Sequence, residues 1–130
     1  MTEPRWISKQ ALLLLHAASL ASFGGSSGIR DEGLLASALA RARNRFLYDT
    51  AVDIAELAAC YGFGIAKNHP FVDGNKRSAL HAIGVFLGIN SYELVTPQAE
   101  AIQAILGLAA GEVSEEELAT WIRINSRPTA

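Results

Sequence analysis

Residues 54–90, IAELAACYGFGIAKNHPFVDGNKRSALHAIGVFLGIN, decide the fold of this 130-residue chain. Apolar side chains recur at helical spacing from Ile54 to Ile65. This helix must close near Asn68, because the residue before Pro70 is pushed out of the helical region. The polar segment NHPFVDGNKRS, residues 68–78, comes next and places His69 at the exit of the helix.

A second helix is predicted directly after this polar segment. From Asn75 the sequence is strongly apolar as far as Gly88 or Asn90, with little polarity on any side of the helix. A helix that is apolar all round is typical of a protein core. We therefore expect the helix that begins at Asn75 to be the central helix of the fold.

Four further helices are predicted outside this stretch. Ser, Thr and Asp are preferred N-caps, proline is favoured at the first helical position, and serine with glutamate three residues later forms a capping box. These four helices and the two helices described above predict an all-α fold of about six helices around a central helix, with almost no strand. The four helices begin at Ser8, Asp31, Thr96–Pro97 and Ser114–Glu117 and run to about Phe23, Ala42, Ala110 and Asn125.

Three connecting segments are predicted to lie outside helices. The stretch Arg41 to Thr50 loses the helical period and gathers charge, so we predict that Asn44 to Thr50 is a connection with some strand or flap character. Ser91 to Val95 is predicted to be a short extended piece. The GGSSG stretch before Ile29 is interpreted as a turn, because no Gly-Lys-Ser or Gly-Lys-Thr follows it as in a phosphate-binding loop.

The composition favours one cytoplasmic domain, residues 1–130, with no affinity for DNA or membranes. Half of the residues are hydrophobic, which is enough for a single core. A formal charge of −2 excludes an electrostatic surface for nucleic acid or anionic lipid. The single cysteine, Cys60, excludes a disulfide framework and favours a reducing cytosol. The apolar run Ala11–Leu15 is too short for a signal peptide, and His16 interrupts it.

The segment 68–78 has the composition of a phosphate-binding site. Gly74 and Asn75 open a helix whose first turn carries Lys76 and Arg77, although the helix dipole disfavours cations there. A bound anion would account for them, because free amides at a helix N-terminus bind phosphate and glycine lets a ligand approach the backbone. Arg77 can grip phosphate oxygens with its planar fork of donors.

Two further residues of the segment suit phosphate transfer. His69 is suited to deprotonate an attacking hydroxyl, because histidine titrates near neutral pH. Asp73 is suited to hold Mg²⁺, which commonly takes one or two protein carboxylates while substrate phosphates supply other ligands. The segment therefore predicts a phosphotransfer site.

The same residues resemble the signature of the Fic/Doc family, which runs His, x, Phe, x, Asp or Glu, Gly, Asn, x, Arg. In the adenylylating branch a glycine follows the asparagine and a second arginine comes three residues after the first, where this chain has Lys76 and Leu80. Both departures point to the death-on-curing (Doc) toxins, whose signature ends in Asn-Lys-Arg. Gly74 is instead shared with the Fic branch and replaces the alanine of the founding Doc toxin. The matching residues are His69, Phe71, Asp73, Gly74, Asn75 and Arg77.

This resemblance implies a Fic fold and a role for each residue of the signature. His69 would be the base, Asp73 would hold Mg²⁺, and Arg77 would bind the nucleotide phosphates. Asn75 would help to position those phosphates, and Phe71 would anchor the loop in the core. In Doc, a lysine at the position of Lys76 is associated with transfer of the γ-phosphate of ATP, so the resemblance implies a kinase.

The resemblance also implies partners. The known target of Doc is elongation factor Tu, and Asn44 to Thr50 would form the flap that docks the target backbone. Fic enzymes can carry their own inhibitory helix, which is marked by Ser or Thr, three residues, Glu and then Gly or Asn. The nearest match here is Thr96 to Glu100, but Ala101 follows it, so no inhibitory helix of this kind is expected in the chain. Inhibition would come from a small antitoxin whose C-terminal helix enters a groove on this domain.

Several other interpretations remain open at this point. Nucleotidyl (AMP) transfer is the alternative within enzymes, motivated by Gly74, and a non-catalytic nucleotide-binding module is the alternative outside them. His16 and His81 are interpreted as structural or exposed, with a secondary role at the nucleotide possible for His81. Arg41, Arg43 and Arg45 are interpreted as a solvated face rather than a nucleic-acid patch.

Overall fold

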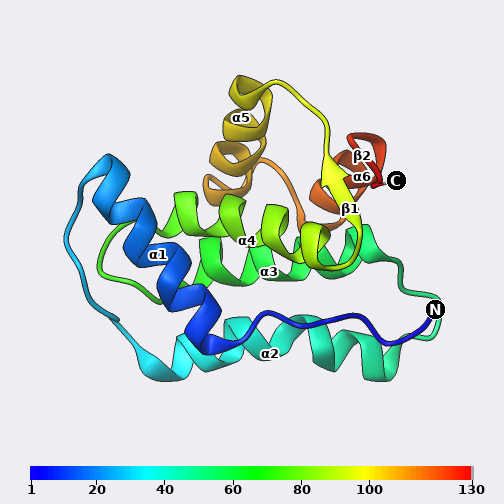
Figure 1. The fold of residues 1–130 in the computed structure, drawn as a ribbon, viewed down its shortest axis with the longest axis horizontal. Helices are drawn as coiled ribbons and strands as arrows, with labels where there is room; N and C mark the ends of the chain where they lie inside the picture. Colours follow the sequence, from blue (N-terminus) through cyan, green and yellow to red (C-terminus); the bar gives the residue numbers. More distant parts are fainter. Residues whose placement is uncertain (130) are drawn as a thin grey trace.

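The computed structural model describes residues 1–129 and confirms an all-α fold (Figure 1). Six helices and two three-residue strands make up its regular structure within those residues. No helix among them is long and apolar enough to cross a membrane. In chain order the elements are α1 (Lys9–Phe23), α2 (Glu32–Tyr48), α3 (Ile54–Asn68), α4 (Asn75–Ile89), β1 (Tyr92–Leu94), α5 (Gln98–Ala109), α6 (Glu115–Ile124) and β2 (Ser126–Pro128).

The central helix is α3 rather than α4, which the apolar pattern had favoured. Eleven of the fifteen residues of α3 are buried, and α2, α4 and α6 all pack against it. Small residues allow this close packing: Gly64 faces the backbone of Ala38 on α2, and Gly62 faces Ile83 on α4. Helix α4 packs along α3 with one face, while Gly84 and Gly88 remain exposed. The polar loop between α3 and α4 is thus attached to the two most buried helices of the core.

The prediction of a connection at Asn44–Thr50 is wrong, because α2 continues to Tyr48. Tertiary contacts extend the helix: Arg45 forms an ion pair with Glu56 of α3, and the ring of Phe46 packs edge-on against Trp6 at 5.6 Å. Two of the three arginines interpreted as solvated are also paired, since Arg41 binds Glu115 of α6. The end of α2 lies at the opposite end of the helices from the loop between α3 and α4 (Figure 1), so this segment is not a flap over that loop.

The helix starts agree closely with the predicted caps. The side chains of Ser8 and Asp31 accept hydrogen bonds from the first turns of α1 and α2, and Ser114 forms the expected capping box with Glu117. Helix α5 begins one residue later than expected: Pro97 is its N-cap residue, and Thr96 donates to Glu100 instead.

The extended piece predicted near Ser91–Val95 is present as β1, but its partner was not foreseen. Strand β1 pairs antiparallel with β2, with Tyr92 opposite Pro128 and Leu94 opposite Ser126. This small sheet joins the end of α4 to the end of α6.

Candidate active site

The loop between α3 and α4 begins at a left-handed residue. His69 is the C-cap of α3 with φ 50° and ψ 57°, and its amide donates to the carbonyl of Ile65. Left-handed backbone costs a non-glycine residue about 1–2 kcal/mol, so the surroundings must hold it. The turn takes the chain out of the helix and leaves the His69 side chain exposed.

The segment that lies against this loop is the stretch Gly28–Asp31. Ile29 forms an isolated antiparallel bridge with Phe71, and the amide of Val72 donates to the carbonyl of Gly28. Arg30 reaches further and donates to the carbonyl oxygens of Asn68 and His69. The glycine-rich segment before α2, and not Asn44–Thr50, therefore occupies the place next to the site loop (Figure 1).

Phe71 and Asn75 hold the loop from the inside. The Phe71 ring is buried with 1% exposure, and its backbone amide and carbonyl both bond to the side chain of Asn75 at 3.0 Å. Asn75 is itself buried, and its Nδ2 lies 3.5 Å from Nδ1 of His69. The carboxamide of Asn75 thus ties the loop together beneath His69, instead of projecting into the solvent where a phosphate would lie.

The N-terminus of α4 is free to receive an anion. Its N-cap residue is Gly74, with φ 78°, and no side chain caps the helix. A serine or aspartate side chain caps α1, α2, α3 and α6, whereas α5, whose N-cap residue is Pro97, shares the absence of a side-chain cap but has no cation in its first turn. Uncapped amides and the positive end of the helix dipole together favour a bound phosphate.

Two cations stand at this helix start. Lys76 is exposed, and the guanidinium of Arg77 lies 4.3 Å from the ring centroid of Phe23 at the end of α1. Within residues 1–129 neither forms an ion pair with a carboxylate. The first turn of α4 therefore combines free amides with two positive charges that have no ion-pair partner among residues 1–129.

Asp73 carries the negative charge of the loop. Backbone amides of Ser26 and Gly74 donate to its two oxygens at 3.2 and 2.8 Å, and with Arg77 nearby they hold the pKa of this carboxyl below its usual value. The side chain is exposed and ionised, which suits a Mg²⁺ ligand. Residues 1–129 hold no cluster of three or more potential metal ligands. The donor set therefore fits an ion that takes one protein carboxylate and completes its shell with phosphate oxygens and water.

His16 is a residue of the site that sequence reasoning missed. It is buried on α1, its ring stacks on Phe71 with a centroid distance of 3.8 Å, and its Nε2 lies 2.8 Å from the carbonyl oxygen of Asp73. The one signal for it was its place four residues after Leu12 on the apolar face of α1. Because histidine on such a face is usually a packing residue, this signal does not by itself point to a site.

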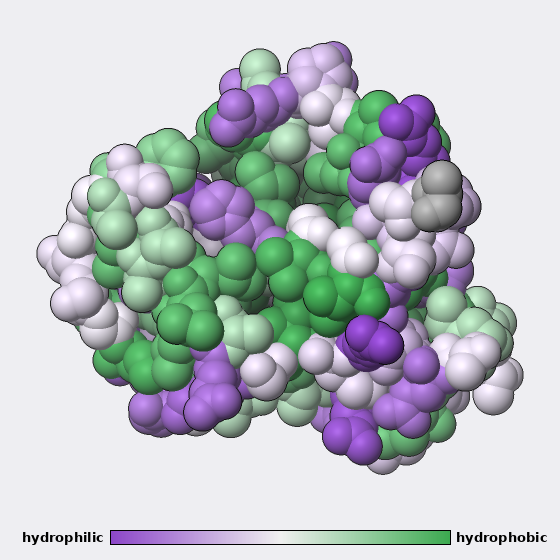
Figure 2. Space-filling view, in the orientation of Figure 1, coloured by the Kyte–Doolittle hydropathy of each residue, from purple (hydrophilic) through white to green (hydrophobic). Residues whose placement is uncertain are grey.

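His81 lies one turn beyond Arg77 on α4 and is half-buried. Burial lowers its pKa, and the positive charge of Arg77 adds to the shift. The ring is therefore neutral at neutral pH. Its neighbours line a hollow of about 560 Å³ between α1, α4 and the start of α5. Most of the residues that line it are apolar, and Figure 2 shows hydrophilic (purple) side chains beside hydrophobic (green) ones between the left-hand lobe and the centre of the molecule.

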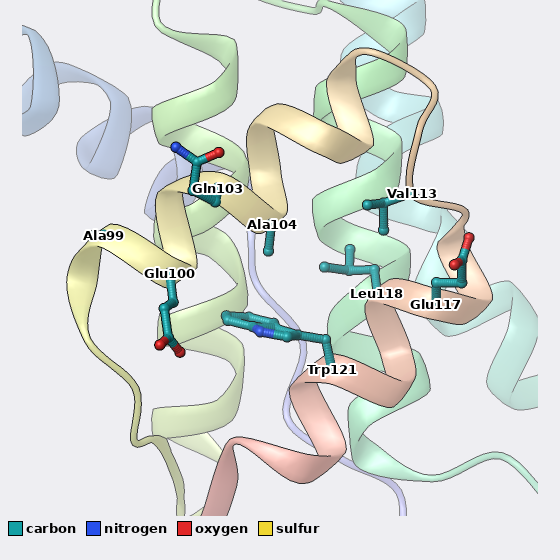
Figure 3. A pocket seen from close by; sticks show the side chains of 8 residues that line it. All are labelled: Ala99, Glu100, Gln103, Ala104, Val113, Glu117, Leu118 and Trp121. Carbon is teal, nitrogen blue, oxygen red and sulfur yellow. The ribbon is translucent and has the colours of Figure 1, made fainter.

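A second groove, also of about 560 Å³, lies between α5 and α6 (Figure 3). Its walls carry Glu100 and Glu117, and its floor carries Leu118 and Trp121. It contains no histidine and no basic residue, and no residue of the loop 68–78 lines it. The groups that could perform chemistry are gathered at the α3–α4 loop instead.

Comparisons with known proteins identify the family of this chain. The family model described as the Fic/DOC family matches residues 6–87, a span that includes the whole loop. A protein named protein kinase doc, from Escherichia phage P1, is 34% identical over 119 residues, which cover 92% of this chain and 94% of the relative. A protein named toxin Doc, from Mycolicibacterium smegmatis, is 42% identical over 82 residues, which cover 62% of each chain.

Proposed function

Because the chain belongs to the Fic/Doc family, we propose that it is a Doc-type toxin that transfers the γ-phosphate of ATP to a protein hydroxyl. The observation that carries this proposal is the start of α4. There an uncapped helix N-terminus and two unneutralised cations lie beside an exposed histidine and an exposed aspartate. A phosphate bound to those amides and cations would lie at the end of the same loop that carries His69.

In the proposed reaction His69 is the general base. Its imidazole accepts the proton of the target hydroxyl while the hydroxyl oxygen forms a bond to the γ-phosphorus of ATP. The bond from that phosphorus to the bridging oxygen breaks, and ADP leaves with the electron pair. The products are a phosphoester on the target, ADP and a proton that His69 passes to solvent. The contribution of such a base is typically 10²–10⁴-fold.

The remaining residues of the loop bind and orient. Arg77 and the first amides of α4 bind phosphate oxygens, and Lys76 adds a positive charge. Asp73 would hold Mg²⁺, which when bound neutralises the charge of the nucleotide phosphates. Asn75 and Phe71 keep the loop in shape by the contacts described above. Elongation factor Tu is the proposed target, with arrest of translation and growth in the cytoplasm as the result.

Two features favour phosphoryl over nucleotidyl transfer. Lys76 stands where the adenylylating branch has glycine, and Leu80 stands where that branch has its second arginine. The relative from phage P1 also carries the name protein kinase. Gly74, which is shared with the adenylylating branch, is the observation that favours AMP transfer as the second candidate.

The proposed inhibitor is a small antitoxin with an amphipathic C-terminal helix. We assign its binding to the hollow between α1 and α4, because the lining is mainly apolar and includes Phe23, whose ring contacts Arg77. A helix seated there would lie against Phe23, the residue whose ring contacts the guanidinium of Arg77. The lining includes Leu15, Phe23, Leu80, His81, Val85 and Leu94.

The test is incubation of the protein with elongation factor Tu and ATP labelled at either the α or the γ position. We expect label on the target from γ-labelled ATP alone, and none from the His69→Ala variant. Label from α-labelled ATP would establish nucleotidyl transfer instead. Growth arrest on expression distinguishes a catalytic toxin from a non-catalytic nucleotide-binding module. If wild type and His69→Ala were equally toxic, catalysis would be excluded as the cause of the growth arrest.

A further inference from the structure

We propose that His16 is a positioning residue that locks the peptide between Asp73 and Gly74, and thereby keeps the start of α4 able to bind phosphate. This inference rests on the proposed function, because it concerns the same phosphate site. It assigns no chemistry to His16 itself. The imidazole acts through the backbone of the loop.

The contacts of His16 are specific to this peptide. Its Nε2 lies 2.8 Å from the carbonyl oxygen of Asp73, across 57 residues of sequence. A carbonyl oxygen only accepts hydrogen bonds, so Nε2 must carry the proton and act as the donor. The ring is 5% exposed and lies 6° from parallel to the Phe71 ring, so its orientation is fixed by the core.

The peptide that His16 holds lies between two anchored points of the loop. On one side, the amide of Val72 is bonded to Gly28, and on the other, the carbonyl of Gly74 accepts from Ser78 in the first turn of α4. Between them, Gly74 has φ 78° and no side chain to oppose rotation of the preceding peptide. The hydrogen bond that reaches this peptide from outside the loop comes from His16.

The orientation matters because the carbonyl and the N–H of a trans peptide point in opposite directions. With the carbonyl directed toward α1, the amide of Gly74 points away from α1, where it donates to its neighbour Asp73. If the peptide between Asp73 and Gly74 flipped, the Gly74 N–H would leave the Asp73 carboxylate and the Asp73 carbonyl would turn away from α1. Its negative end would then face the phosphate that the first turn of α4 is arranged to bind.

Three substitutions separate this role from simple packing. His16→Gln places an amide donor at about the reach of Nε2, although it loses the aromatic stack. His16→Phe keeps the stack on Phe71 and has no donor. His16→Asn keeps an amide, but its side chain is too short to reach the Asp73 carbonyl. The locking role requires that His16→Gln resemble the wild type in kcat and in the exchange of the Gly74 amide. It also requires that His16→Phe and His16→Asn resemble each other in both properties.

The experiment measures kcat and KM for ATP together with the hydrogen exchange of the Gly74 amide and the melting temperature. For His16→Phe and His16→Asn we expect kcat to fall by about tenfold to a hundredfold, as for a misplaced reacting group. The Gly74 amide should exchange faster in both variants, and inorganic phosphate should protect it less than in wild type. His16→Gln should recover most of the activity and most of the protection.

The outcomes separate this inference from the proposed function. Wild-type Gly74 exchange in His16→Phe, or a glutamine variant as impaired as the phenylalanine variant, would overturn the lock. If His16→Phe does not fold, His16→Gln and His16→Asn are compared instead, and equal impairment of these two variants would overturn the lock. If the wild type transfers no phosphate to any target, the proposed function fails, and the exchange of Gly74 with and without inorganic phosphate still tests His16.

Discussion

Arg30 Nε lies 2.6 Å from the carbonyl oxygen of His69, and Nη2 of the same side chain lies 2.7 Å from that of Asn68. These carbonyls belong to the C-terminal end of α3, which carries partial negative charge and lacks further backbone donors. One guanidinium therefore stabilises both the end of the helix and the left-handed turn at His69. The position of the proposed base depends on a residue 39 positions earlier in the chain.

Arg30→Ala should reduce activity far more than it reduces stability. An exposed cation at a helix C-terminus contributes about 0.3–1 kcal/mol, so the variant should fold normally. The turn at His69 would become mobile, and we expect kcat to fall by roughly tenfold or more. Phosphotransfer kinetics and urea denaturation of the same preparations provide the measurement.

The matched control is Arg43→Ala, which removes an exposed arginine of α2 that makes no hydrogen bond with the loop. It should retain wild-type kinetics. Arg30→Lys should fall between wild type and Arg30→Ala, because an ammonium lacks the planar fork that spans two carbonyls. Wild-type kcat in Arg30→Ala would show that the turn at His69 holds without this contact.

Local signals in the sequence were sufficient for most helix boundaries. Serine and aspartate at helix starts cap the backbone within a few residues, so Ser8, Asp31 and Ser114 marked their helices correctly. The loop 68–78 was also recognisable, because a bound anion explains basic residues at a helix N-terminus. These features depend on residues close in sequence, and periodicity and capping chemistry therefore report them.

The errors came from contacts between distant residues. Helix α2 continues past Ala42 because Arg45 and Phe46 find partners on other segments, and neither partner is visible from the local pattern. Strand β2 exists because the chain after α6 meets β1. His16 looked like a packing residue, and only its contact with Asp73, 57 residues away, places it at the site.

Gly25→Ala should impair the site, whereas Gly24→Ala should not. Both glycines have positive φ, 82° at Gly24 and 121° at Gly25, so each substitution strains the backbone. Only a Cβ at Gly25 meets the loop, because it would lie 2.9 Å from Oδ2 of Asp73. A Cβ at Gly24 has no neighbour within 4 Å.

We therefore expect Gly25→Ala to displace the Asp73 carboxylate and to raise the Mg²⁺ concentration that gives half-maximal activity. A titration of kcat against Mg²⁺ concentration for both variants measures this difference. Gly24→Ala should follow the wild-type curve. Identical curves for the two variants would mean that the carboxylate moves aside without consequence for metal binding.

Cys60 should make the protein less stable in alkaline solution. Its side chain is 1% exposed, and burial raises the pKa of the thiol from its ordinary value of 9.0 to about 11. The nearby carboxylate of Glu115 adds to the rise, while Arg45 opposes it. Below pH 9 the thiol is protonated in both the folded and the unfolded state. Between pH 9 and pH 11 the unfolded state releases its proton first, so the free energy of unfolding falls as pH rises.

The loss at pH 11 should be roughly 2–3 kcal/mol, because each unit of pKa shift corresponds to about 1.4 kcal/mol. Urea denaturation at a series of pH values measures it, and Cys60→Ala is the reference that lacks the thiol. We expect a shallower alkaline slope in Cys60→Ala, even if its stability at neutral pH is lower. Equal slopes would assign the alkaline loss to other groups, such as the buried Tyr61, whose pKa is also raised.

Gly64→Ala should destabilise the fold, although alanine is the better helix former by about 1 kcal/mol. A Cβ at this position would lie 3.2 Å from the Cα of Ala38 and 3.4 Å from its carbonyl oxygen, at the closest approach of α3 and α2. Backbone atoms cannot rotate away, so the two helices would have to separate. Overpacking of this kind typically costs 1–3 kcal/mol, which exceeds the gain in helix propensity.

Gly84→Ala is the control that isolates this packing effect. It lies inside α4, is exposed, and would place its Cβ more than 4 Å from any neighbour outside the helix backbone. The gain in propensity should then be realised, and the variant should be more stable than wild type by roughly 0.5–1 kcal/mol. Chemical denaturation of both variants gives the two free energies. If Gly64→Ala were stabilised as much as Gly84→Ala, α2 would be free to move away from α3, and close packing at Gly64 would not be what places α3 at the centre of the fold.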